Sequence, residues 1–497
     1  MNDFSNDYAG YAHLLRKYAL KAPEPLHESS LVDGTIRRIQ PRGRTIDERF
    51  PRSYDPGDDD FDHLVFALKY DGVDLSALTR IFACLDRAAL TRRIAARPTS
   101  KHGRRIFFLF EFLTGERLDL EDLQRGNYTP LLDPADYFVA EGRPSPRHRV
   151  DDNLLGDRAL CPVVRRSEAL AQASARDLRG RAEAITRAVD PTLLARAISY
   201  LYTKETRSSF AIEREAPGSK LERFVAQLAG IGERALVGEG ELTVLQQELV
   251  DPRYAEPGFR RPGDLEVYVG ETIGLHEKIH HIGAPSAIAT ALMAAWARLR
   301  PVIGAGGAIV EAALRSFTFV FLHPFGDGNG RIHRLLLHNV LARRGALPPR
   351  LVVPISAVIL DDLASYDRAL ETLSARILPL LEWSLDGDGI LTLLRADDDL
   401  YRYPDLTAVC EANFVWLERA IEVDLVQEIE LIRRFDEVRA RMREVVEMPD
   451  RKEQLFLNLC LHNRGRLSRN KRSRFAELDD ETVAALEAIV AEVFTTG

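Results

Sequence analysis

Residues 323–334 read His-Pro-Phe-Gly-Asp-Gly-Asn-Gly-Arg-Ile-His-Arg and combine several residue types that can do chemistry. Glycines at every second position, Gly326, Gly328 and Gly330, allow positive φ angles, so successive backbone N–H groups can point into one concavity that binds an anion. A helix is expected where this loop ends, and its free N–H groups and positive dipole end point at the same place. The segment therefore predicts a phosphate-binding loop.

The charged side chains of the segment agree with that interpretation. Arg331 and Arg334 lie three residues apart at the start of the helix, where two cations beside a positive helix end are unfavourable unless an anion joins them. Asp327 is a single carboxylate inside the loop, and Mg²⁺ often binds one or two carboxylates while phosphate oxygens and water complete its coordination. His323, with an ordinary pKa near ~6.5, could take a proton from an incoming hydroxyl. These residues indicate a site for a polyphosphate, a divalent metal and a hydroxyl group.

Two other interpretations of the segment remain open at this point. The Gly-Asp-Gly-Asn-Gly run is compatible with a surface turn that follows a histidine at a helix end. A calcium loop is a weaker rival, because the EF-hand pattern needs more oxygen ligands and a glutamate at its twelfth position, where Arg334 stands.

The twelve residues resemble the signature of the Fic family, His-Pro-Phe-x-Asp/Glu-Gly-Asn-Gly-Arg-x-x-Arg, at every fixed position. The resemblance extends over roughly residues 190–385. It implies a protein adenylyltransferase, which transfers AMP from ATP, with Mg²⁺ or Mn²⁺, to a Tyr, Thr or Ser hydroxyl of a target protein and of the enzyme itself. UMP or another phosphate-containing group is the alternative cargo within the family.

The resemblance also assigns roles to individual residues. It implies that His323 is the general base and that Asp327 binds the metal between the α- and β-phosphates. The residues that it implies for nucleotide binding are Phe325, Gly326, Gly328, Asn329, Gly330, Arg331, Arg334 and Tyr366.

A second resemblance concerns regulation. Ser209 and Glu213 resemble the inhibitory motif of Fic proteins, Ser/Thr-x-x-x-Glu-Gly/Asn, which implies that the Glu213 carboxylate takes the place of the ATP γ-phosphate on Arg334. Arg214 departs from the glycine or asparagine of the motif.

Two helices are expected around this motif. The first begins at residue 190, with Asp190 as its N-cap and Pro191 as its first residue. The second is short, near residues 208–217, with Ser208 or Ser209 as its N-cap.

The elements around the site are expected to be helices and one hairpin. The apolar run 307–322 predicts a buried helix that ends at His323, before a proline, and residues 331–345 predict the next helix. Alternating residues at 265–270 predict a strand. By resemblance, this strand and the chain to Ile282 form the family's flap, a hairpin that binds the target segment by strand pairing.

Three regions are expected along the chain, and the fold class is mainly α with a Fic-type helical core and one short hairpin. Residues 1–185 are expected to be a mainly helical domain of unknown function, with a loop or extended linker at 22–61 where Pro, Gly and Asp recur. Residues 186–385 are the expected catalytic domain, and residues 386–497 a helical region.

A second motif competes for a catalytic role. His276, Glu277 and His280 fit H-E-x-x-H, which on a helix holds zinc in a metalloprotease. Glycines on both sides, Gly274 and Gly283, argue against the long helix that this site needs. The histidines are therefore interpreted as flap or loop residues.

A further alternative is a catalytically silent Fic fold that binds nucleotide or DNA. The basic segment 463–475 is either the edge of a winged-helix-like module or a solvated loop. A formal net charge of −8 argues against nucleic acid as the main partner. Four widely spaced cysteines and the lack of a long apolar run favour a cytoplasmic protein without a membrane partner.

Overall fold

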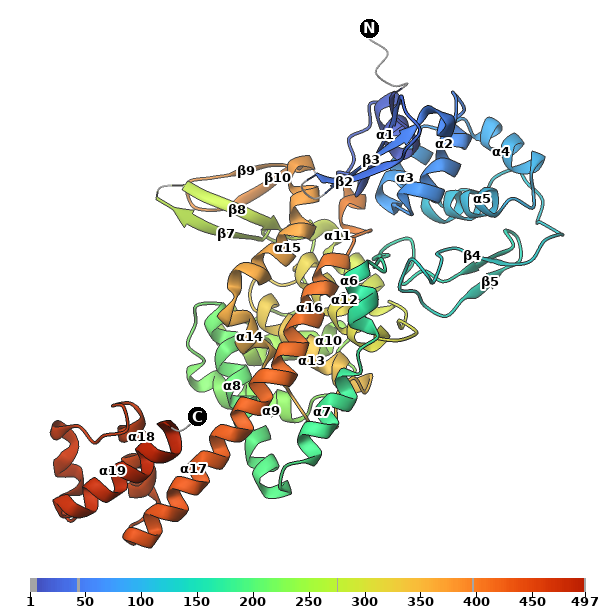
Figure 1. The fold of residues 1–497 in the computed structure, drawn as a ribbon. Coiled ribbons are helices and arrows are strands. Elements are labelled where there is room, and N and C mark those ends of the chain that lie inside the picture. Colours follow the sequence, from blue (N-terminus) through green and yellow to red (C-terminus); the bar gives the residue numbers. More distant parts are fainter. Residues whose placement is uncertain (1–6, 43–44, 275, 396, 496–497) are drawn as a thin grey trace.

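The structure, a computed structural model, describes residues 7–42, 45–274, 276–395 and 397–495. As expected, the fold is mainly helical with small sheets. The N-terminal helices and sheets lie at one end of the molecule, and the last helices lie at the other end (Figure 1). The helices that carry the candidate site lie between them (Figure 1).

The N-terminal region contains more sheet than expected. Its helices are α1 (Gly10–Lys17), α2 (Asp60–Phe66), α3 (Leu75–Phe82), α4 (Arg87–Ala96) and α5 (Lys101–Thr114). Its strands are β1 (His27–Val32), β2 (Arg38–Arg42), β3 (Thr45–Pro51), β4 (Thr129–Pro130), β5 (Arg143–Ser145) and β6 (Val150–Asp152). They form two three-stranded sheets, with the orders β1-β3-β2 and β4-β6-β5.

The expected linker at 22–61 is wrong, because β1, β2 and β3 form a sheet within it. Strand β3 pairs with β1 in parallel and with β2 in an antiparallel manner. The apolar–polar alternation typical of a strand is absent because a buried position of β3 is polar. Glu48 is buried and pairs with Arg37, so buried positions are not all apolar.

Helices dominate the central region. They are α6 (Glu168–Ser174), α7 (Leu178–Arg187), α8 (Pro191–Ile212), α9 (Leu221–Ala229), α10 (Glu239–Leu249), α11 (Ser286–Ala297), α12 (Gly307–Leu322), α13 (Asn329–Arg343), α14 (Ile355–Asp361), α15 (Leu363–Ile377) and α16 (Thr407–Arg419). Helices α12 and α13 pack against each other, and nearly every residue of α12 is buried. The buried helix expected at 307–322 is therefore confirmed.

One long helix replaces the two helices expected between residues 190 and 218. Asp190 caps the N-terminus of α8, and Pro191 is its first residue, as expected. The helix then runs without a break to Ile212, and Ser208 and Ser209 are buried within it rather than capping a new helix. The helix continues because Phe210, directly after the two serines, is fully buried in the core and holds the next turn in place.

Two antiparallel hairpins lie beside the helices. The first, the flap, is β7 (Tyr268–Ile273) with β8 (His276–Ile282), and the second is β9 (Glu382–Leu385) with β10 (Leu391–Arg395). The flap strand begins three residues later than predicted, because the Glu266 carboxylate accepts hydrogen bonds from the Ser286 backbone N–H and hydroxyl at the start of α11. The second hairpin was not predicted.

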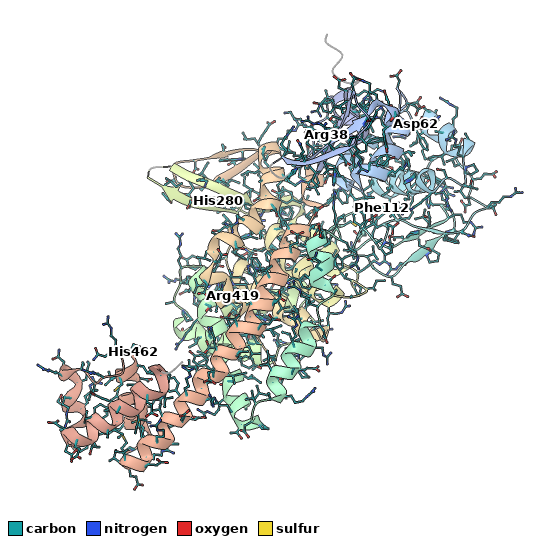
Figure 2. The ribbon with its side chains drawn as sticks, viewed as in Figure 1. Arg38, Asp62, Phe112, His280, Arg419 and His462 are labelled. Atoms are coloured by element: carbon teal, nitrogen blue, oxygen red, sulfur yellow. The ribbon has the colours of Figure 1, made fainter. Side chains whose placement is uncertain are left out.

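The C-terminal helices are α17 (Leu425–Val445), α18 (Asp450–Leu461) and α19 (Asp480–Thr495). Figure 2 shows Arg419, the last residue of α16, partway along the long helical stretch that continues into α17, and His462 directly after α18. The basic segment is partly a 3₁₀ turn, Arg469–Phe475. Residues 425–495 contain no strand, so the winged-helix alternative, which needs a β wing, is wrong for this part of the chain.

Three large hydrophobic clusters form the interior. One lies in the N-terminal region, one runs from Phe138 to Ile429, and one lies between Val438 and Val490. The expected domain boundaries near residues 185 and 385 stay predictions. In the part of the chain that the structure describes, no helix combines the length and the apolarity that a membrane crossing requires.

Candidate active site

The loop at residues 323–328 joins the two buried helices α12 and α13. His323 ends α12 in the left-handed conformation, at φ 53°, and Gly328 precedes α13 at φ 89°. Phe325 is fully buried, with its ring centroid 5.2 Å from that of Phe259. Asn329 ties the loop to itself: its side-chain oxygen accepts from the Phe325 N–H (3.1 Å), and its amide nitrogen donates to the Phe325 carbonyl (2.7 Å). The loop is thus held rigidly by its apolar anchor and its amide.

The glycines of the loop serve two purposes, not the single one expected. Only Gly328 has a positive φ, because the helix has already begun at Gly330. A Cβ atom on Gly326 would lie 2.8 Å from a carboxylate oxygen of Glu256, and one on Gly330 would lie 2.1 Å from a carboxylate oxygen of Glu213. Gly326 and Gly330 therefore let carboxylates approach the backbone closely.

His323 has the charge state that a general base needs. Burial lowers its pKa to about 4, so the imidazole is neutral near neutral pH. Its Nδ1 lies 2.9 Å from the Val320 carbonyl, which can only accept, so Nδ1 carries the proton and Nε2 keeps its lone pair. His323 lines a cavity of about 540 Å³ together with flap residues such as Gly270 and Lys278 and residues of α15.

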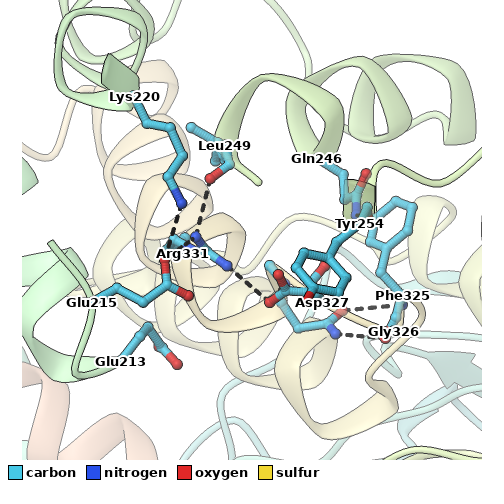
Figure 3. Close-up of polar contacts among 12 residues, drawn as sticks. Glu213, Glu215, Lys220, Gln246, Leu249, Tyr254, Phe325, Gly326, Asp327 and Arg331 are labelled. Atoms are coloured by element: carbon cyan, nitrogen blue, oxygen red, sulfur yellow. Dashed lines mark hydrogen bonds and ion pairs between the residues drawn. The ribbon is translucent and has the colours of Figure 1, made fainter. Parts of the chain in front are cut away.

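The two arginines of the segment are buried and held by carboxylates. Arg334 donates to Glu213 (Nη2 to Oε1, 2.7 Å) and to the Ser209 hydroxyl (Nε to Oγ, 2.9 Å). Arg331 donates to Glu215 (3.0 Å) and to Asp327 (2.8 Å), and Glu215 also accepts from Lys220 (Figure 3). The structure thus brings Ser209, Glu213 and Arg334 together.

Each of the two guanidinium groups also has one N–H donor without an acceptor among the described residues. Within the described residues, Nη1 of Arg334 and Nε of Arg331 are buried without a hydrogen-bond partner. A buried donor without an acceptor is unfavourable, so an arriving anion would be favoured at this place. This observation fits a polyphosphate.

The end of α8 directs two glutamates at the two arginines. Arg214 takes the left-handed conformation, at φ 57°. Its N–H donates to the Ala211 carbonyl, and the Glu215 N–H donates to the Phe210 carbonyl, which is the Schellman arrangement of a helix C-terminus. An arginine thus adopts the conformation that glycine or asparagine favours, and Glu213 and Glu215 leave the helix end toward Arg334 and Arg331.

Asp327 offers one partly exposed carboxylate. Its Oδ1 accepts from the Gly328 N–H (2.5 Å) and from Arg331. The described residues contain no group of three or more His, Cys, Asp or Glu that could enclose a metal ion. A single carboxylate beside phosphate-binding groups fits Mg²⁺, which commonly takes its remaining ligands from phosphate and water.

Three of the implied nucleotide contacts look different in the folded chain. The Phe325 side chain anchors the loop in the core, and the side chain of Asn329 is engaged with the backbone of Phe325. Tyr366, on α15, is buried with its hydroxyl 3.2 Å from Nε2 of His333. A direct nucleotide contact from any of the three stays a prediction.

The competing H-E-x-x-H motif lies on a strand and not on a helix. His276 and His280 are both in β8, and four residues along a strand span about 13 Å, too far for both to bind one ion. His280 lies on the flap (Figure 2), with Nε2 3.2 Å from Glu271. The zinc-protease geometry is therefore wrong for these residues, and their interpretation as flap residues is confirmed.

Sequence reasoning missed two acidic residues of the site, Glu215 and Glu256. Glu215 stands two positions after Glu213, and only the conformation of Arg214 shows that both face the arginines. Glu256 lies far from the loop in the sequence, yet it accepts from the Gly326 N–H at 2.6 Å. No residue pattern marks that contact.

Comparison with models of protein families identifies a domain that includes residues 323–334. The model of the Fic/DOC family matches residues 239–341. The crystal structure of a Fic family protein from Desulfovibrio desulfuricans G20 has 19% sequence identity and a TM-score of 0.39, with 63% of this chain and 88% of that chain covered. No curated protein matches the chain. The chain therefore contains a Fic/DOC family domain at residues 239–341.

Proposed function

We propose that the chain is a protein adenylyltransferase that is held in check by Glu213. The observation that carries the proposal is the pair of buried arginines, Arg331 and Arg334, whose partners are carboxylates. One of these carboxylates, Glu213, lines the same cavity as the neutral His323. A phosphate of ATP could replace a carboxylate as the partner of each buried guanidinium. The neutral imidazole could take the proton of a hydroxyl nucleophile.

In the proposed reaction, the target hydroxyl oxygen attacks the α-phosphorus of ATP. A new O–P bond forms, the bond between the α-phosphorus and the bridging oxygen breaks, and pyrophosphate leaves with that electron pair. Nε2 of His323 takes the hydroxyl proton. Arg331 and Arg334 hold the outer phosphates, so the α-phosphorus lies in line with the nucleophile. Mg²⁺ or Mn²⁺ on Asp327 would neutralise charge on the phosphates.

The flap supplies the proposed target site. Among the residues that the structure describes, β7 and β8 form a two-stranded sheet in which β8 packs against α15 and β7 is exposed. The edge of β7 is therefore the one proposed to take an added strand of the target. The cavity at His323 is bounded by flap residues such as Val269 and Gly270. A Tyr, Thr or Ser hydroxyl of a target, or of this chain itself, would reach His323 from there.

Glu213 is the proposed brake. Its carboxylate occupies Arg334, and only one anion can take that position at a time. The intramolecular carboxylate has the advantage of a high effective concentration. ATP can then bind only with its γ-phosphate away from Arg334, and its α-phosphorus is out of line with the hydroxyl.

The test is incubation of the full chain with Mg²⁺ and ATP labelled at the α-phosphate, alongside ATP labelled at the γ-phosphate. We expect label from the α-phosphate alone on protein, at a low level in the wild type and at none in His323→Ala, which should still bind ATP. Chelation of the metal should stop the transfer. ATP binding without transfer in both the wild type and Glu213→Gly, the variant that removes the proposed brake, would instead favour a catalytically silent Fic fold.

A further inference from the structure

The glycine-rich loop already holds an anion of the protein itself. Oε1 of Glu256 accepts from the Gly326 N–H at 2.6 Å and from the Asp327 N–H at 3.3 Å. The absence of a side chain at Gly326 makes this approach possible, since a Cβ there would lie 2.8 Å from the same oxygen. A carboxylate on two adjacent backbone N–H groups is the arrangement expected of an anion in a nest.

Contacts from α10 hold Glu256 in this position. The Gln246 side-chain oxygen accepts from the Glu256 N–H (3.0 Å), and the Gln247 amide donates to the Glu256 carbonyl (2.8 Å). Gln246 is fully buried and also donates to the carbonyls of Tyr254 and Asp327. Figure 3 shows Gln246 and Tyr254 beside the loop at Gly326 and Asp327. The segment before Glu256 is thus clamped to the loop.

The contact is electrostatically costly. The Glu256 carboxylate is partly buried and lies against the backbone of Asp327, whose own carboxylate is also negative, so the two like charges repel each other. The N–H groups of Gly326 and Asp327 offset part of this cost. An occupant held against such repulsion can be displaced by a ligand that brings more negative charge.

Glu256 and Glu213 lie at opposite ends of the loop. Glu256 is on the N–H groups of Gly326 and Asp327, whereas Glu213 lies over Gly330 and on Arg334. No residue is shared between the two contacts. Their effects on a nucleotide should therefore be separable.

We propose that Glu256 is a second intramolecular anion of the nucleotide site, one that competes with a nucleotide phosphate for the backbone N–H groups of Gly326 and Asp327. The inference rests on the proposed function for the identity of the phosphate ligand. Glu213 controls how ATP is aligned and hence the turnover. Glu256 controls how tightly the phosphates bind.

The variants Glu256→Gln and Glu256→Asp test the contact in two ways. Glutamine keeps the shape without the charge, and aspartate keeps the charge but is shorter by one methylene and no longer reaches the loop. Both should bind the phosphates about tenfold more tightly than the wild type, since a charge-assisted contact that must be broken no longer opposes binding. Glu241→Gln, an exposed glutamate of α10, is the control of equal charge change and should leave the affinity unchanged.

The measurement is calorimetric titration of the full-length chain with Mg²⁺-ATP and, separately, with inorganic tripolyphosphate, after thermal unfolding has shown that each variant is folded. Tighter binding of both ligands by both Glu256 variants, without change in Glu241→Gln, supports the proposal. Unchanged or weaker binding by Glu256→Asp and Glu256→Gln overturns it.

The two proposals can fail separately. If the Glu256 variants bind tripolyphosphate more tightly but no variant transfers AMP, the competition stands and the proposed function fails. If Glu213→Gly transfers AMP while the Glu256 variants bind both ligands as the wild type does, the proposed function stands and the competition fails.

Discussion

The surroundings of His323 leave its imidazole neutral and able to accept a proton. Burial depresses its pKa, and the Val320 carbonyl orients Nδ1, so Nε2 keeps its lone pair. The sequence predicts the residue and its role but not this charge state. The shift depends on packing by α12 and by Arg260, whose positive charge also lowers the pKa.

The pH dependence of transfer follows from that pKa. With a value of about 4 in the folded chain, the imidazole stays unprotonated well below its ordinary value. Transfer by the Glu213→Gly variant should therefore be nearly constant between about pH 8 and about pH 6, and the base should be lost only in stronger acid. Initial rates of AMP transfer across this range check it. A loss of rate with a midpoint near ~6.5, the ordinary histidine value, would contradict the assigned environment.

At the scale of elements, the decisive feature is how α8 ends. Residues Ser209 and Glu213 could be paired with Arg334 from the motif alone, yet the short helix expected around them is wrong. Ser209 lies in the last turn of the continuous helix α8, and Glu213 is its C-cap, directly before Arg214 turns left-handed. The motif could be recognised because its residues are close together in the sequence. The length of the helix could not be predicted, because it depends on the burial of Phe210 against residues far away in the sequence.

Arg214 stores strain that a glycine would release. A non-glycine residue at φ 57° is unfavourable, so Arg214→Gly should raise the free energy of unfolding by about 1 kcal/mol. Because Glu213 and its contact are kept, transfer should stay as low as in the wild type. Denaturant unfolding and the transfer assay measure the two effects. Arg207→Gly, at an exposed position inside α8, is the matched control and should lose about 1 kcal/mol.

A contrary result would be informative about the helix end. If Arg214→Gly destabilises the chain as Arg207→Gly does, the left-handed turn is not strained. If it raises transfer to the level of Glu213→Gly, the arginine side chain itself is part of the restraint.

Sheets were the least predictable elements. The flap was found from its alternating residues, with an error of three positions at its start. The sheet of β1, β2 and β3 was missed for two reasons. Strand β3, the last of the three in the chain, lies between β1 and β2 and pairs with β1 in parallel, and buried Glu48 breaks the apolar pattern. Long-range pairing of this kind leaves little trace in a local window of sequence.

At the scale of the whole molecule, the hydrophobic clusters differ in how closely they are joined. Backbone hydrogen bonds connect the N-terminal and central clusters. The Cys161 N–H donates to the Arg402 carbonyl (2.8 Å), and the Val163 N–H donates to the Pro404 carbonyl (3.0 Å). The C-terminal cluster is reached through α17. The helices of this last region could be predicted from their periodicity, but their separate core could not, since it depends on which helices meet.

Unfolding should reflect this division. We expect two calorimetric transitions, one of which belongs to the C-terminal cluster. Phe456→Ala, which removes a fully buried side chain of that cluster, should destabilise only this transition, by about 3–5 kcal/mol, and leave ATP binding unchanged. A single transition, shifted as a whole by the substitution, would show that the three clusters unfold as one unit.

The central claim is that the whole chain is an adenylyltransferase restrained by one of its own carboxylates. The most direct test is intact mass spectrometry of Glu213→Gly after a time course with ATP and Mg²⁺, beside the wild type and the double variant Glu213→Gly with Arg334→Ala. We predict that the single variant gains AMP on itself far faster than the wild type, because Arg334 is free for the γ-phosphate. The double variant should lose this gain, because the guanidinium that Glu213 occupies is the same one that would hold the γ-phosphate. Equal masses for Glu213→Gly and the wild type at every time point would contradict the claim.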